Sequence, residues 1–155
     1  QKLSELLQEM ESRPINDFVI HRKPMLLLDR IISLKPQSAE CEWRVDSDNL
    51  FLVPDKGVPN YIGIEYMAQC IAVHGGACDR ASGNKPSQGF LLGTRQYDSK
   101  VPYFYLNNSY RVKCGMLIKN PDGMCAFSCQ IMSGNRVLAE ARISILQPTG
   151  ENAHD

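Results

Sequence analysis

The chain has 155 residues, of which 43% are hydrophobic, and this suffices for the core of one domain. Its 17 acidic residues balance 17 basic ones, which argues against a nucleic-acid-binding surface, where an excess of basic residues supplies most of the affinity. No apolar run approaches the roughly 18 residues that cross a membrane, so we expect no membrane span.

The first part of the chain predicts a short helix followed by two strands. Apolar residues recur at three-four spacing within residues 1–14, which is typical of an amphipathic helix, and Pro14 ends it. The dense apolar run over residues 25–34 indicates a buried strand. Residues 39–46 alternate between apolar and charged side chains, which indicates a strand with one solvent-facing side.

A long helix is predicted over residues 61–82, and the Gly83–Pro86 segment ends it. Turn signals then separate four predicted strands. These strands cover residues 88–97, 106–118, 124–132 and 136–146. The polar tail over residues 148–155 is predicted to be disordered.

Hairpin connections after the long helix predict an antiparallel sheet, and the helix itself is apolar on nearly all sides. A curved antiparallel sheet wrapped around a long central helix satisfies both patterns. This α+β architecture is the hotdog fold. We therefore expect a hotdog domain over residues 15–147, with a helix over residues 1–14 before it.

Glu65 is a single carboxylate within the apolar start of the long helix. Because burying an unpaired charge is costly, Glu65 must be exposed, paired or chemically employed. We interpret it as a buried acid/base group near free helix N–H groups, which stabilise developing negative charge. Gln69 lies one turn further on and is expected to orient the Glu65 carboxyl by hydrogen bonding. The alternative is a buried carboxyl that caps backbone amides and performs no reaction.

Two motifs resemble those of FabZ-type 3-hydroxyacyl-ACP dehydratases. They are HRKPMLLLDRI over residues 21–31 and EYMAQ over residues 65–69. Together with GFLLGTRQY over residues 89–97, the pattern is more similar to a divergent branch of the FabZ/FabA superfamily, the ApeP-like dehydratases of aryl-polyene gene clusters. The likeness covers roughly residues 15–147.

This resemblance implies an enzyme that removes water from a 3-hydroxyacyl thioester to give a 2-enoyl thioester, in fatty-acid or aryl-polyene-type synthesis. It implies an acyl carrier protein with a phosphopantetheine thioester as partner. It also implies a dimer whose two sheets pair edge to edge, with acyl tunnels at the interface. We expect a homodimer or larger homo-oligomer, or a heteromer with another hotdog subunit.

The resemblance assigns the catalytic acid/base role to Glu65. FabZ-type enzymes pair this glutamate with a histidine of the facing subunit, fourteen residues earlier in sequence, where this chain has Phe51. His21 is therefore the predicted catalytic partner, because the corresponding loop of FabZ-type proteins lies beside the active site. The alternative for His21 is a loop anchor that hydrogen-bonds backbone, and His74 is predicted to be structural.

Five residues are candidates for binding the substrate: Asn60, Tyr61, Gln69, Arg95 and Tyr97. Arg95 and Tyr97 fit either a tunnel lining or the rim of a strand. The basic residues Arg22, Lys23 and Arg30 fit either a docking site for an acidic carrier protein or a solvated face.

Six scattered cysteines without a C-x-x-C pair predict reduced thiols in a cytoplasmic protein, with no metal site and no cofactor. The charged N-terminal segment does not resemble a signal peptide. Two further functions stay open. One is a hotdog acyl thioesterase, in which the helix carboxylate activates water. The other is a non-catalytic subunit that binds the acyl carrier within a heteromeric dehydratase.

Overall fold

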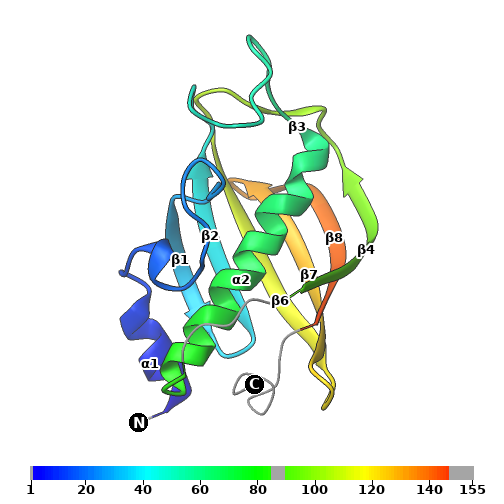
Figure 1. The fold of residues 1–155 in the computed structure, drawn as a ribbon. Helices are drawn as coiled ribbons and strands as arrows, with labels where there is room; N and C mark the ends of the chain where they lie inside the picture. The colour runs from blue at the N-terminus through cyan, green and yellow to red at the C-terminus, as the bar shows by residue number, and fades with distance from the viewer. Residues whose placement is uncertain (1, 85–89, 147–155) are drawn as a thin grey trace.

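The computed structural model describes residues 2–84 and 90–146, apart from the side chains of Phe90, Leu91, Leu92 and Arg95. A six-stranded antiparallel sheet curves around the long helix α2 (Figure 1). The predicted tail over residues 148–155 lies outside the described residues, as does the start of the predicted strand 88–97.

The helices and strands follow one another in an order close to the predicted one. They are α1 (Leu3–Met10), a 3-10 turn (Ile15–Asp17), β1 (Arg30–Lys35), β2 (Ser38–Arg44), β3 (Gly57–Pro59), a 3-10 turn (Asn60–Ile62), α2 (Gly63–Ala81), β4 (Phe90–Ser99), β5 (Tyr103–Tyr105), β6 (Ser109–Lys119), β7 (Met124–Ser133) and β8 (Arg136–Leu146).

The six-stranded sheet has the order β1-β2-β6-β7-β8-β4, so β1 and β4 form its two edges. Strands β3 and β5 form a separate two-stranded sheet, in which β3 directly precedes the 3-10 turn that leads into α2. These three-residue strands were not predicted, because three residues are too few to show an alternating pattern. Strand β1 begins five residues later than predicted, since Met25 and Leu26 donate their N–H groups to the Arg22 carbonyl in a turn.

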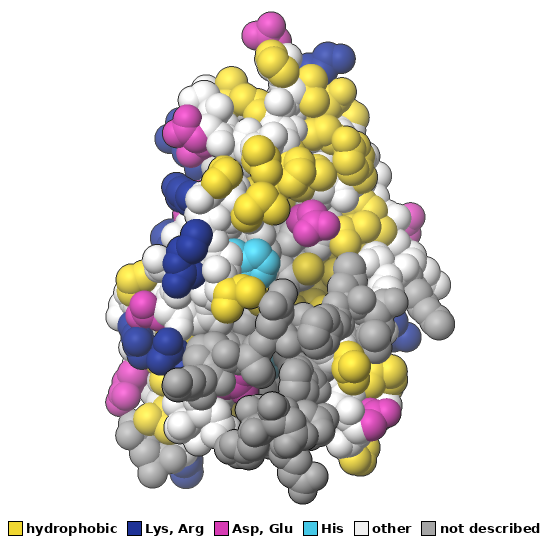
Figure 2. Space-filling view, viewed as in Figure 1, with side chains coloured by type: hydrophobic (Ala, Val, Ile, Leu, Met, Phe, Trp, Pro, Cys, Tyr) yellow, Lys and Arg dark blue, Asp and Glu magenta, His cyan; other side chains and the backbone are white. Residues whose placement is uncertain are grey.

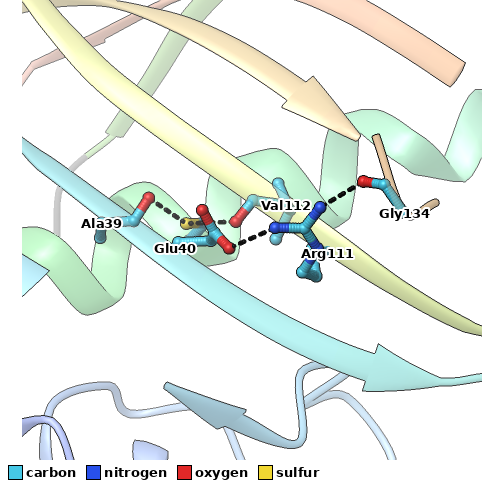
Figure 3. A network of polar contacts seen from close by, with 6 residues as sticks. Ala39, Glu40, Arg111, Val112 and Gly134 are labelled. Atoms are coloured by element: carbon cyan, nitrogen blue, oxygen red, sulfur yellow. Dashed lines mark hydrogen bonds and ion pairs between the residues drawn. The ribbon is translucent and has the colours of Figure 1, made fainter. Parts of the chain in front are cut away.

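The core lies between α2 and the concave face of the sheet. Tyr66 of α2 stacks on Trp43 of β2, with ring centroids 3.9 Å apart, and Phe104 meets both rings edge-on. The Cys70 thiol lies 3.6 Å from the carbonyl oxygens of Ala39 and Val112 on neighbouring strands (Figure 3). Aromatic stacking and buried thiols thus fix the inner side of the helix to β2 and β6.

The opposite face of the sheet is polar. Arg111 of β6 forms an ion pair with Glu40 of β2 at 2.9 Å and donates a second hydrogen bond to the Gly134 carbonyl (Figure 3). Strands β2, β6, β7 and β8 therefore have the one apolar and one wet face that alternation predicts.

Candidate functional site

Helix α2 is covered by the sheet on one side only. The side chains of Ile64, Ala68 and Ala72 are half-buried, whereas the side chain of Tyr61, in the preceding 3-10 turn, is 65% exposed. Together with Glu65, these residues recur at three-four spacing and share one side of the helix. We call Tyr61, Ile64, Glu65, Ala68 and Ala72 the outer stripe of α2.

Glu65 lies in the first turn of α2 and is exposed in the single chain. The expectation that it is buried is therefore wrong for one chain, because the sheet packs against the opposite side of the helix. Glu65 has no hydrogen bond or ion pair with any of the described residues. Its carboxylate is thus available to a ligand or to another subunit.

Gln69 is 5% exposed, and both polar atoms of its side chain form hydrogen bonds with the backbone of the loop before β1. Its Oε1 accepts a hydrogen bond from the Leu27 N–H at 2.9 Å, and its Nε2 donates to the Met25 carbonyl at 2.7 Å. The expected hydrogen bond from Gln69 to Glu65 is not formed. The two residues are one helical turn apart, but one side chain is exposed and the other is packed against residues 25–27.

His21 is half-buried, and its ring makes no hydrogen bond to the described part of the chain. Its Nδ1 atom is shielded from solvent without a partner among these residues. The neighbouring Arg22 performs the anchoring instead, because its Nη1 donates to the carbonyls of Val19 and His21 at 2.8 Å. The His21 ring is therefore free to meet a ligand, although no ion pair joins it to Glu65.

Asn60 and Tyr97 fix the start of α2. The Asn60 side chain donates to the Val101 carbonyl at 2.9 Å, and the Tyr97 hydroxyl donates to the Asn60 carbonyl. Burial raises the pKa of Tyr97 to about 12, so its hydroxyl remains a donor. Gly63 is needed here, since a Cβ at this position would lie 2.1 Å from the Tyr97 oxygen.

The remaining residues singled out by the sequence are Tyr61, Arg95 and Phe51, and they differ in exposure and contacts. Tyr61 is exposed beside Glu65 on the outer stripe. The Arg95 backbone pairs with Arg142 in the sheet, but its side chain lies outside the described atoms. Phe51, which the resemblance matches to the FabZ-type histidine, is half-buried and packs against the core.

Two further features agree with their predicted structural roles. His74 is 2% exposed, and its Nε2 lies 3.1 Å from the carbonyl oxygens of Lys35 and Pro36. All six cysteines are free, and only Cys78 is partly exposed.

Over residues 2–84 and 90–146, no three histidine, cysteine or acidic side chains gather in a way that suits a metal ion. None of the helices in this part of the chain has the length and hydropathy needed to cross a membrane.

On the face that contains the outer stripe, hydrophobic and charged side chains occupy different areas (Figure 2). Hydrophobic side chains gather over its upper half, around the N-terminal half of α2, and acidic and histidine side chains border them (Figure 2). Basic side chains lie along its left side, over β1 and β2 (Figure 2). The exposed Arg22 and Lys23 belong to the loop that precedes β1, while Arg30 pairs with Glu42 at 2.9 Å.

Solved structures with the same arrangement define the fold class. The chain is similar to the dehydratase heterocomplex ApeI:P from Xenorhabdus doucetiae, with a TM-score of 0.82 and 27% identity over 91% of this chain and 95% of the other. It is also similar to the virulence protein Cj0977 from Campylobacter jejuni (TM-score 0.64, 12% identity, 89% and 97% covered). The phenylacetic acid degradation protein PaaI from Thermus thermophilus gives a TM-score of 0.57 at 11% identity, with 76% and 91% covered. The protein has the predicted hotdog fold.

The family follows from the sequence itself. The model of the ApeP-like family, described as ApeP dehydratase, matches residues 13–155. The chain therefore belongs to the ApeP-like dehydratases, as the motifs predicted. Among curated proteins, no sequence matches the chain.

Proposed function

We propose that the chain acts as a dehydratase on 3-hydroxyacyl thioesters held by an acyl carrier protein, with Glu65 and His21 as its proton-transferring residues. The observation that supports this most is the free carboxylate of Glu65, which has no partner among the described residues and lies on the uncovered side of α2. The His21 ring, equally without a hydrogen-bond partner there, is the second available group.

In the proposed reaction, one of the two residues removes the proton at C2 as a base. The other gives a proton to the hydroxyl at C3 as an acid. The C2–H electrons form the C2=C3 double bond while the C3–O bond breaks, and water leaves. A positioned acid or base of this kind contributes roughly 10²–10⁴-fold in rate. Tyr61 and Arg95 are the proposed contacts for the acyl chain or the phosphopantetheine, whereas Asn60 and Tyr97 shape the helix start next to it.

The proposed site is completed by assembly. Strand β4 pairs only with β8 among the described residues, so its other edge is open to a strand of a second subunit. Pairing there would also cover the apolar part of the outer stripe and remove Glu65 from bulk water. The exposed Arg22 and Lys23 are the proposed docking residues for the acidic carrier protein, by charge complementarity.

A second function is favoured by Phe51, which provides no imidazole where FabZ-type enzymes have one. The similar ApeI:P structure is a dehydratase heterocomplex. In this alternative, the chain contributes Glu65 and carrier-binding surface to a mixed site, and another hotdog subunit supplies the missing catalytic group.

The substitution Glu65→Gln tests both functions. We expect at least a 10²-fold loss of 2-enoyl thioester formation, because the amide cannot exchange a proton with the substrate. The matched control is Glu5→Gln, which changes an exposed glutamate in the first turn of α1 and should leave the rate unchanged. The measurement is product formation from a 3-hydroxyacyl carrier protein, followed by mass spectrometry.

The outcomes separate the candidates. Unchanged turnover in Glu65→Gln would contradict the proposed role of this residue. Release of the free thiol of the carrier would identify a thioesterase instead. If the purified chain is inactive alone and active only with a second hotdog subunit, the mixed-site function is supported.

A further inference from the structure

Gln69 connects α2 to the loop that contains His21. Both polar atoms of its side chain bind backbone, one at Leu27 and one at Met25, at 2.9 and 2.7 Å. Since the side chain is 5% exposed, water cannot easily replace either bond. Neither of these bonds goes to Glu65, so the two bonds that the amide makes hold the loop rather than the carboxylate.

The same loop is held to α2 at its other end. Arg80 donates from Nε to the Asp17 carbonyl at 2.7 Å. Gly76 lies so close to Phe18 that a Cβ at residue 76 would be 1.9 Å from the Phe18 carbonyl oxygen. Residues 69, 76 and 80 lie on one side of the helix, so they hold residues 17–27 along it.

His21 lies between these two attachments. Its ring makes no hydrogen bond of its own among the described residues, and Arg22 binds only carbonyls of the same loop, those of Val19 and His21. The position of the imidazole therefore depends on the loop backbone and on the packing that shields Nδ1. On the C-terminal side, that backbone is fixed to α2 by Gln69.

We propose that Gln69 is a positioning residue that holds the 25–27 backbone and thereby places the His21 imidazole alongside α2. This inference rests on the proposed function, because it gives His21 a role in the reaction. It assigns Gln69 to the histidine side of the site rather than to Glu65.

The test compares two substitutions at residue 69. Gln69→Met keeps the side-chain length and helix propensity but removes both hydrogen bonds, whereas Gln69→Glu keeps the acceptor for the Leu27 N–H. The control is Gln130→Met on β7, which removes only a hydrogen bond to Glu140. Imidazole NMR resonances report on His21 directly, with His21→Asn used for their assignment.

We expect Gln69→Met to shift or broaden the His21 resonances and to leave those of His74 unchanged. Displacement of the imidazole should lower kcat by about 10²-fold with KM nearly unchanged. Gln69→Glu should fall between the Met variant and the wild type, and Gln130→Met should behave as the wild type. A residue with a merely structural role would change stability without moving the His21 signals.

Wild-type His21 resonances in a folded Gln69→Met protein would overturn the proposal. If that variant does not fold, unchanged resonances in Gln69→Glu would overturn it equally. The NMR comparison does not depend on turnover. An inactive wild-type protein would therefore contradict the proposed function alone, while shifted His21 resonances in the variants would still support the positioning role.

Discussion

His74 links the stability of the protein to pH. Burial lowers its pKa from the usual 6.5, against the opposing effect of the carbonyls of Pro36 and Lys35. Because Nε2 faces these carbonyls, it carries the hydrogen of the neutral ring. Protonation would place a second N–H on Nδ1, which is buried without a partner among the described residues. The charged form is therefore disfavoured in the folded state.

The sign of the pH effect follows from this direction. Between the lowered folded pKa and the unfolded value of about 6.5, the unfolded chain binds more protons, so stability decreases as the pH falls through this window. The contribution has a maximum slope of about 1.4 kcal/mol per pH unit. We expect urea unfolding at pH values from about 7.5 down to about 5 to show this decrease, and His74→Gln to remove it. The control His21→Gln should retain the decrease. An unchanged slope in His74→Gln would contradict the assignment.

Single residues show what sequence motifs can and cannot predict about the site. The motifs placed Glu65 and Gln69 on the same helix and selected His21 as the available imidazole. They did not predict the partners of Gln69, since these lie 42 and 44 residues away and depend on how the loop packs. Nor did they predict that Glu65 is exposed, because periodicity does not say which side of an apolar helix the sheet leaves uncovered.

At the scale of elements, α1 protects one edge of the sheet. The Glu11 carboxylate, directly after α1, accepts a hydrogen bond from the Leu34 N–H of edge strand β1 at 2.9 Å. The buried Leu7 fixes the helix to the core. Exposed backbone groups on an edge strand invite pairing with other chains, so this cover leaves β4 as the available edge among the described strands.

Substitution of Glu11 tests the cover of β1. We expect Glu11→Ala to lower the free energy of unfolding by roughly 1–2 kcal/mol, because a half-buried, charge-assisted hydrogen bond is lost. Glu5→Ala, an exposed position in α1, should change it by less than about 0.5 kcal/mol. Urea denaturation of both variants measures the difference. Equal stabilities would show that the Glu11–Leu34 bond does not contribute.

Elements were predictable in proportion to their length and regularity. Alternation located β2, β6, β7 and β8 within a few residues, and the long apolar run located α2. The run over residues 25–34 was assigned to a strand from its hydrophobicity alone. Its first half is a turn and loop held by Gln69, a contact that only the tertiary structure provides.

At the scale of the whole molecule, the two edges of the sheet differ. Edge β1 is covered by α1 and by Glu11, whereas β4 has no strand on its outer side in the described part of the chain. The open edge belongs to β4, which pairs with β8 and is the next strand after α2 in the chain. In the proposed assembly, a partner subunit extends the sheet at β4 and also meets the outer stripe of α2, where it would cover Glu65.

Ala72 provides the sharpest test of this assembly. It lies two helical turns beyond Glu65 on the half-buried outer stripe, so its substitution reaches the interface without touching the reacting group. We expect Ala72→Arg to place unpaired charges in the proposed contact and to reduce the mass in solution to that of one chain, 17.4 kDa.

The control Ser128→Arg adds the same charge on the exposed outer face of β7 and should leave the assembly intact. Light scattering coupled to size exclusion measures both. A wild-type protein of 17.4 kDa, or an Ala72→Arg variant that keeps the wild-type mass, would contradict the proposed interface.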